Sequence, residues 1–252
     1  MIEILLNQSD LVIAICVIGS LILVSLGVTW LVIRFSGEQL LRTYSGLVPN
    51  FGATLVAGFV LFVALVINGI LHDRALAEQA VDQEAHALHE AQTLLDKKQH
   101  PGWHQAIAAY IGKVINDEWQ DMSRRIRSHG AHDALQNLRS LALDGLPGIS
   151  AETRRELIDT VREIDSARER RLFVAADQIP GEIWATLCLT ALASMFFCAA
   201  IHARAPSSAY TMAALYGLVI GSMFFTIVAI DSPFLGPSAV SGHAIARLAA
   251  GS

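Results

Sequence analysis

Four long apolar segments organise this chain. Residues 11–33, 51–71, 183–201 and 210–230 contain no charged side chain. Each segment is close to the roughly 20 residues that a helix needs to cross the hydrocarbon core of a bilayer. The pattern therefore predicts a polytopic membrane protein with four transmembrane helices.

The second apolar segment continues directly into a polar one. Between residues 72 and 98 there is no glycine or proline, and alanine, leucine, glutamate and glutamine, which favour helices, are abundant. The sequence predicts one helix over residues 51–98, on the order of 70 Å long. We expect Pro101 and Gly102 to end it.

Helical periodicity continues through the polar middle of the chain. It predicts helices at residues 103–127, 133–143 and 150–178, the last with an N-cap at Ser150. The apolar face of the first is Ile107, Tyr110, Ile111, Val114, Ile115, Trp119, Met122 and Ile126, and that of the last includes Leu157, Val161, Ile164 and Leu172. No strand-like alternation is long enough to matter, so the predicted fold is all-α.

The predicted organisation has three parts. Residues 1–71 hold the first pair of membrane helices, residues 72–181 form a soluble helical domain, and residues 182–252 hold the second pair and a C-terminal tail. The segment 11–33 is expected to be a permanent span, because Glu3 and Asp10 precede it and no lysine or arginine does, unlike a signal peptide.

Composition supports this division. Of the 252 residues 53% are hydrophobic and only 16% are charged, which is less charge than a soluble domain usually carries. Residues 72–181 nevertheless hold 14 of the 18 basic and 18 of the 23 acidic side chains. Mixed charge of this kind is typical of a solvated surface, and without a basic stripe we expect no nucleic-acid partner.

The sequence contains no recognisable enzyme motif. It lacks a phosphate-binding glycine loop, Gly-x-Ser-x-Gly, Cys-x-x-Cys and His-Glu-x-x-His, and its three cysteines lie in apolar segments. We therefore expect no catalytic residue, no cofactor and no metal site, and predict that the protein is not an enzyme.

Acidic and histidine side chains on the long helix form a candidate metal site. Glu78, Asp82, His86, His89 and Glu90 carry side chains that could ligate a divalent cation. The Glu-x-x-His pairs of a di-iron bundle are missing, so we favour a solvated helix face.

One face of the second span is a candidate pore lining. Leu55, Phe59, Phe62, Val66 and Gly69 recur every three or four residues. Around an oligomer axis they would form a hydrophobic constriction, and the positive edges of phenylalanine rings would tolerate a weakly hydrated anion. The alternative is that the same stripe packs on neighbouring helices or lipid. Asn68, the strongly polar side chain of this span, is expected to bond to another helix.

Charged and aromatic motifs mark the rest of the chain. Glu84 lies in QEAHAL, Glu118 and Trp119 lie in DEW, and Arg168 and Arg171 lie in RERRL before Ile179 and Pro180. The fourth span is followed by DSPFLG, which supplies Asp231, Pro233, Phe234 and Gly236. In this order and spacing the motifs resemble the bacterial bestrophin-like family, over residues from about 50 to 240.

The resemblance implies a function. Bestrophins are oligomeric anion channels whose second membrane helix lines the pore, so we expect passive conduction of inorganic ions, chloride among them, through a homo-oligomeric ring, with a pentamer as the suggested size. It also implies a bacterial inner-membrane protein surrounded by lipid. Clustered arginines favour a cytoplasmic soluble domain and cytoplasmic termini. No acidic run resembles the calcium clasp of bestrophins, so calcium gating is not expected.

Two further points stay open at this level. The alternative function is a non-conducting membrane protein whose cytoplasmic helical domain binds a partner or senses a signal.

The motif residues also have two interpretations. A buried carboxylate needs a partner, so we expect Glu118 to pair with Arg168 or Arg171 and Glu84 to have a structural role of the same kind. We expect Trp119 to pack in the bundle. A line of charge along an ion path is the other interpretation. Asp231 and Pro233 are expected to form a turn at the membrane edge.

Overall fold

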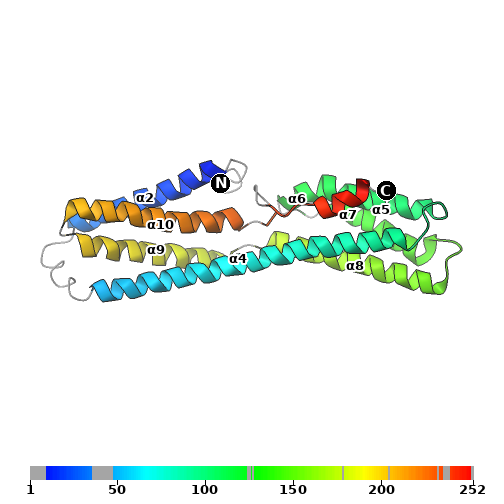
Figure 1. Ribbon diagram of the computed structural model, residues 1–252, viewed down its shortest axis with the longest axis horizontal. Coiled ribbons are helices and arrows are strands. Elements are labelled where there is room, and N and C mark those ends of the chain that lie inside the picture. The colour runs from blue at the N-terminus through cyan, green and yellow to red at the C-terminus, as the bar shows by residue number, and fades with distance from the viewer. Residues whose placement is uncertain are drawn as a thin grey trace. The chain divides into compact units, whose positions relative to one another are not determined.

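The protein is helical throughout the part that the structure describes. The computed structural model describes residues 10–35, 48–123, 126, 128–177, 179–203, 205–231, 233–234 and 239–250. The chain divides into two compact units, Met1–Leu71 with Gln178–Ser232, called the membrane unit below, and His72–Asp177 with Pro233–Ser252, called the extramembrane unit (Figure 1). The predicted all-α fold is confirmed.

The membrane unit contains the four predicted spans. They are α2 (Asp10–Phe35), the first part of α4 (Val48–Thr93), α9 (Gly181–His202) and α10 (Pro206–Ile230). Within the described residues, four helices are long and apolar enough to cross a membrane. Each extends a few residues beyond the charge-free segment from which it was predicted.

Two glycines let α2 and α10 approach closely. A Cβ atom on Gly217 would lie 2.7 Å from the Cα of Ile22, and one on Gly221 would lie 2.8 Å from the Cα of Ile18. Ser25 Oγ donates a hydrogen bond to the carbonyl of Ala213 over 2.8 Å. This is the packing of small residues four apart that brings membrane helices together (Figure 1).

The remaining core of the membrane unit joins α4 to α9 and α10. Phe59 and Val63 of α4 pack in one apolar cluster with Leu187 of α9 and with Ile220 and Phe224 of α10. The cluster is built from large aliphatic and aromatic side chains, so van der Waals contact is what holds α4 to its neighbours.

The extramembrane unit is a helical bundle built on the second part of α4. Around it lie α5 (Pro101–Lys113), η1 (Val114–Glu118), α6 (Trp119–Ser123), α7 (His129–Ser140), η2 (Leu141–Gly145), α8 (Ala151–Ala176) and α11 (His243–Ala250). The core holds Leu88, Trp103, Ile107, Leu135, Leu157 and Ile164 among others. The buried indole of Trp103 donates to the carbonyl of Ala91 over 2.8 Å, which ties α5 to α4.

Several boundaries differ from the predictions. The long helix ends at Thr93 rather than at residue 98, and Pro101 begins α5, where its missing N–H is not needed. The single helix predicted over residues 103–127 is three elements, because the π-helical turn η1 separates α5 from α6. One extra residue in a turn leaves no mark in the hydrophobic period. Ile126, predicted to face inward, is 55% exposed.

The last soluble helix matches its prediction. Ser150 caps α8 by accepting a hydrogen bond from the N–H of Thr153 over 3.1 Å. Leu157, Val161, Ile164 and Leu172 on its inner face are all buried.

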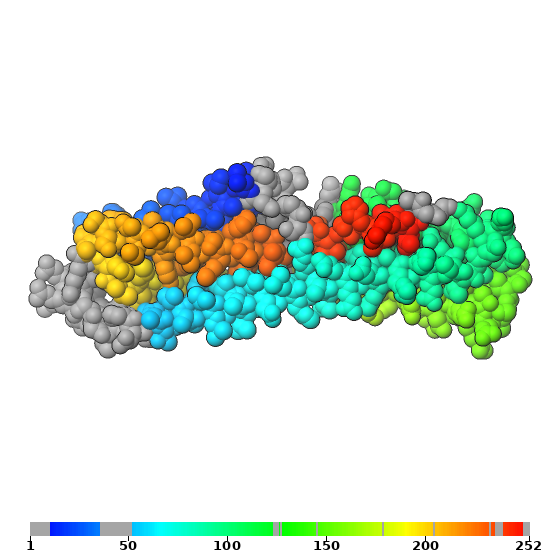
Figure 2. All heavy atoms as spheres, viewed as in Figure 1, coloured from blue at the N-terminus to red at the C-terminus, as the bar shows by residue number. Residues whose placement is uncertain are grey.

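The C-terminal segment folds with the extramembrane unit, which differs from its predicted grouping with the second membrane pair. Phe234, Val240 and Ile245 are buried in the core of this unit. The N–H of Val240 donates to the carbonyl of Pro233 over 2.7 Å. Figure 2 shows the segment, in red, against the cyan surface of α4. The C-terminal segment packs on the extramembrane unit because its few apolar side chains complete the bundle core.

Replacing Gly221 with leucine should separate α2 from α10. The side chain would collide with the backbone at Ile18, which cannot move without displacing α2, and overpacking of this kind costs about 1–3 kcal/mol or more. Thermal unfolding of the detergent-solubilised protein should show a lower midpoint. Gly27→Leu is the matched control, because nothing lies within 4 Å of a Cβ at Gly27. Equal midpoints for the two variants would contradict the close contact.

Candidate functional site

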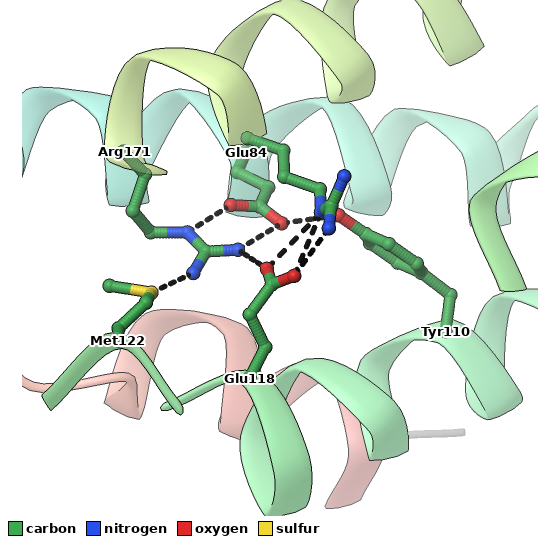
Figure 3. Close-up of polar contacts among 6 residues, drawn as sticks. Glu84, Tyr110, Glu118, Met122 and Arg171 are labelled. Carbon is green, nitrogen blue, oxygen red and sulfur yellow. Dashed lines mark hydrogen bonds and ion pairs between the residues drawn. The ribbon is translucent and has the colours of Figure 1, made fainter. Parts of the chain in front are cut away.

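Four charged side chains are buried together in the extramembrane unit. Glu84 of α4, Glu118 of η1 and Arg171 of α8 are 0% exposed, and Arg168 of α8 is 2% exposed. With Tyr110 of α5 they form what we call the charge network (Figure 3). The two carboxylates and two guanidinium groups balance, so the core carries no net charge.

Arg171 joins the two glutamates. Its Nε lies 2.7 Å from Oε2 of Glu84, and its Nη2 lies 3.2 Å from Oε1 of Glu84 and 2.7 Å from Oε1 of Glu118 (Figure 3). Its Nη1 donates to the sulfur of Met122 over 2.6 Å. Every nitrogen of this guanidinium therefore has a partner, which is what allows the group to be buried.

Arg168 holds Glu118 from the other side. Its Nε lies 3.2 Å and 3.1 Å from the two carboxylate oxygens, and its Nη2 donates to Oε2. Charge-assisted, forked contacts of this type are stronger than neutral hydrogen bonds. Glu118 is thus bound by two arginines that lie three residues apart on one face of α8.

Tyr110 completes the network. Its hydroxyl donates to Oε1 of Glu84 over 2.6 Å. Burial, followed by the negative charge of Glu84, raises the pKa of Tyr110 well above its ordinary value. Burial by itself would lower the pKa of Arg171, but Glu84 and Glu118 outweigh it and the pKa is raised. Burial by itself would also lower the pKa of Arg168, but the hydrogen bonds to Glu118 and its negative charge outweigh it, so the pKa is raised. The arginines stay charged and the tyrosine stays neutral.

An aromatic pair connects this network to the C-terminal segment. The Trp119 ring lies 5.1 Å from Cζ of Arg171, a cation–π contact, and meets the ring of Phe234 edge-on at 5.8 Å. A Cβ on Gly242 would lie 3.3 Å from the indole, so the tail backbone passes directly over Trp119.

The local sequence explains how these groups meet. Tyr110, Val114 and Glu118 are four residues apart, and the wide turn of η1 keeps the last two on the buried side of the segment. A π-helical turn often places a functional or buried polar residue. Glu84 lies on the face of α4 that also carries Ala77, Val81 and Leu88 in the core.

The expected pairing of Glu118 is confirmed, with both Arg168 and Arg171 rather than one of them. Glu84 pairs with Arg171, and Trp119 packs against the core as predicted. Sequence reasoning missed the roles of Tyr110 and Met122. A tyrosine on an otherwise apolar helix face was the available signal, because a buried hydroxyl needs a partner.

The remaining motif residues lie elsewhere. Asp231 follows α10 in the membrane unit, where its N–H donates to the carbonyl of Ile227 over 2.9 Å. Pro233 begins the C-terminal segment of the other unit. Gly236 lies outside the described residues.

The predicted pore stripe is only partly accessible. Phe59 is 2% exposed and packs inside the subunit, so its ring does not face a surface that an ion could reach. Leu55, Phe62 and Val66 are half-buried, and Gly69 is exposed. The hypothesis that Phe59 forms the constriction is therefore inconsistent with this packing.

The open face of α4 lies about a quarter-turn away from that stripe. It carries Thr54, Ala57, Gly58, Leu61, Leu65 and Asn68. Leu61 and Leu65 are 62% and 61% exposed. Asn68 was expected to bond to another helix, yet its amide makes no hydrogen bond to any residue that the structure describes.

The acidic face of α4 is solvated, as favoured from sequence. Glu78, Asp82, His86, His89 and Glu90 are all exposed. Glu78 makes a surface ion pair of 3.3 Å with Arg74. In the described part of the chain no three histidine, cysteine, aspartate or glutamate side chains are placed to share a metal ion.

These features define a class. Four membrane-crossing helices, one of which continues into a helical bundle with a balanced buried ion-pair network, make this a multi-pass helical membrane protein. The Bestrophin-like domain matches residues 19–245, and the chain belongs to the bestrophin-like family.

Structure comparison agrees at the level of the fold. The crystal structure of a membrane protein superposes with a TM-score of 0.64 at 12% sequence identity, covering 92% of this chain and 95% of the other. At that identity the likeness concerns the fold alone. A search of the curated proteins found no match.

Removing Glu118 should destabilise the protein strongly. Glu118→Met leaves two arginines with one buried carboxylate, and breaking a buried pair on one side costs about 3–5 kcal/mol. The double variant Glu118→Met with Arg168→Met restores neutrality and should lose less than the sum of the single losses. Denaturant unfolding followed by tryptophan fluorescence measures this coupling. Arg170→Met, on the solvent side of α8, is the control and should change little; strict additivity would contradict the network.

Tyr110 should make stability fall at high pH. Its pKa is higher in the folded state, so above about pH 10 the unfolded chain binds fewer protons and the unfolding free energy decreases. Tyr110→Phe removes this contribution and costs about 1–3 kcal/mol, since Glu84 loses a donor. Unfolding free energies at about pH 9 and about pH 11 should differ less in the variant than in the wild type. An equal pH dependence would contradict the burial of this hydroxyl.

Proposed function

We propose that this protein is an oligomeric channel for passive ion flow, anions in particular, with a pore lined by α4. The observation that carries the proposal is the open face of α4 in the membrane unit. This face is exposed in the subunit although it carries Asn68, an amide without a partner among the described residues.

A bilayer does not satisfy such an amide. Hydrocarbon offers no hydrogen-bond partner, and polar side chains in membrane spans usually face another protein segment or water. Assembly of several subunits with their α4 helices around one axis would place Asn68 next to water or a neighbouring copy. Membership of the bestrophin-like family supports this arrangement, since that family is generally one of ion channels.

In this arrangement the exposed leucines, rather than the phenylalanines, form the hydrophobic constriction of the pore. Leu61 and Leu65 are separated by one helical turn and would form two hydrophobic rings about the axis. Such rings gate by excluding water. Leu55, Phe62 and Val66 flank this face at its half-buried edge, and the exposed Gly69 lies on the same flank.

Selectivity for anions is the finer part of the proposal. No acidic side chain lies between Gly52 and Leu71, so no negative charge in this span repels an anion. The Asn68 amide supplies a donor that can solvate one. We place the protein in a bacterial inner membrane with the extramembrane unit in the cytoplasm, which the arginines near the membrane favour.

Polar substitution of the proposed constriction should raise ion flux. Leu61→Ser or Leu65→Ser would wet the narrow ring and increase chloride efflux from proteoliposomes by about tenfold or more. Leu189→Ser is the matched control, because Leu189 is 68% exposed on a different span, α9. Phe59→Ala should reduce stability, since it opens a cavity in the subunit core.

Two outcomes would reject parts of this proposal. Equal efflux for Leu61→Ser, Leu65→Ser and Leu189→Ser would exclude the open face of α4 as the lining. No ion flux from any variant, with the protein correctly folded, would favour the non-conducting, partner-binding alternative.

A further inference from the structure

A small hollow lies between α7, η2 and α8 in the extramembrane unit. Its volume is about 220 Å³, which is room for roughly seven water molecules. Pockets that hold drug-sized ligands usually measure about 300–1,000 Å³. The hollow therefore suits a ligand the size of an amino acid and is too small for a nucleotide.

The floor of the hollow is apolar. Leu135 of α7, Ala142 of η2 and Val161 of α8 line it and are 2%, 1% and 3% exposed. The half-buried Ile158 and the exposed Leu143 extend this surface toward solvent. An apolar group of a ligand would be stabilised here, because it would leave water for a surface of aliphatic side chains.

The wall that η2 contributes is held in place by Arg154 of α8. The guanidinium of Arg154 donates to the carbonyl of Leu146 over 3.2 Å and also to the carbonyl of Leu143. Carbonyls at the end of a helix have no partner within it, so these hydrogen bonds fix the backbone that borders the hollow. A π-helical turn such as η2 is frequent at functional sites. The hollow thus has the preformed character of a ligand pocket.

Two opposite charges line the hollow without pairing. Arg139 of α7 and Asp165 of α8 both border it, and neither makes a hydrogen bond or ion pair with any residue that the structure describes. The other charged groups of the lining are engaged, because Arg162 pairs with Asp159 over 3.0 Å and Glu169 is not free. One guanidinium and one carboxylate therefore remain for a ligand.

We propose that this hollow binds a free amino acid with an apolar side chain, of the leucine or methionine type. Arg139 binds the carboxylate of the ligand, because the fork of a guanidinium matches two carboxylate oxygens. Asp165 accepts hydrogen bonds from its ammonium group, and its side chain lies on the apolar floor. The inference goes beyond the proposed function and does not depend on ion conduction.

Ligands with one charge fit the hollow less well. A simple carboxylate would leave Asp165 without a partner and an alkylamine would leave Arg139 without one, and covering an unpaired charge is costly. Glycine would satisfy both charges but would leave the apolar floor in contact with water. The three features together select a zwitterion with an aliphatic or thioether side chain.

Titration calorimetry with leucine on the full-length, detergent-solubilised protein tests the site. Arg139→Gln and Asp165→Asn should each weaken leucine binding by about tenfold or more, because each loses a hydrogen bond between charged groups. Arg155→Gln and Asp133→Asn are the matched controls, since these residues are exposed on α8 and α7 and do not line the hollow. The controls should bind leucine as the wild type does.

Leucine analogues assign each charge to its partner. N-acetyl-leucine lacks the ammonium group and leucine methyl ester lacks the carboxylate, so each should bind the wild type at least about tenfold more weakly than leucine. Asp165→Asn should no longer prefer leucine to N-acetyl-leucine, and Arg139→Gln should no longer prefer leucine to the methyl ester. A merely structural role of either residue would not produce this matched loss of selectivity.

Three results would overturn the inference. One is a folded wild type that binds neither leucine, methionine nor phenylalanine. Another is a loss of affinity in the control variants as large as that in the hollow variants. The third is an analogue preference that Arg139→Gln and Asp165→Asn retain. Thermal unfolding verifies that each variant is folded, and the analogue series on the wild type decides the matter for any variant that is not.

Other occupants of the hollow have distinct outcomes. If Arg139→Gln changes the mass of the solubilised protein while the wild type binds no amino acid, the hollow contacts another protein chain and the proposal is wrong. Leucine binding with the expected selectivity in a protein without ion flux would reject the channel and keep this site. Ion flux in a protein that binds no amino acid would reject the site and keep the channel.

Discussion

The neutral cluster of Glu84, Glu118, Arg168 and Arg171 is the interaction on which the extramembrane unit depends. Its members come from α4, η1 and α8 and are separated by up to 87 positions in the chain. Taking any one of these charges out of water costs several kcal/mol, and the cost is offset only when all partners are in place. The cluster therefore requires the three elements to dock in one register.

Trp119 connects the C-terminal segment to this buried charge cluster. The indole lies against Arg171 on one side and against Phe234 and the backbone at Gly242 on the other. A segment that the sequence groups with the last membrane span is thus part of the bundle. The hydroxyl of Tyr110 and the sulfur of Met122 fill the remaining bonding positions, which leaves the network without an unsatisfied charge.

The proposed function starts from the open face of α4 in the membrane unit. Asn68 on this face is exposed in the subunit, although an amide in a membrane span favours contact with another protein segment or with water. A ring of subunits with α4 around its axis would supply that contact.

The sequence alone determined the class and the four spans, because charge-free length permits few solutions. It narrowed the partners of Glu118 to Arg168 or Arg171, since a buried carboxylate needs a positive charge, and the structure shows that both arginines bind it. It could not place the open face of α4, since Phe59 and Leu61 are equally apolar and only the positions of α9 and α10 decide which is buried. The π-helical turn η1 and the recruitment of the tail were also beyond it. These features depend on contacts between distant segments, which local periodicity does not record.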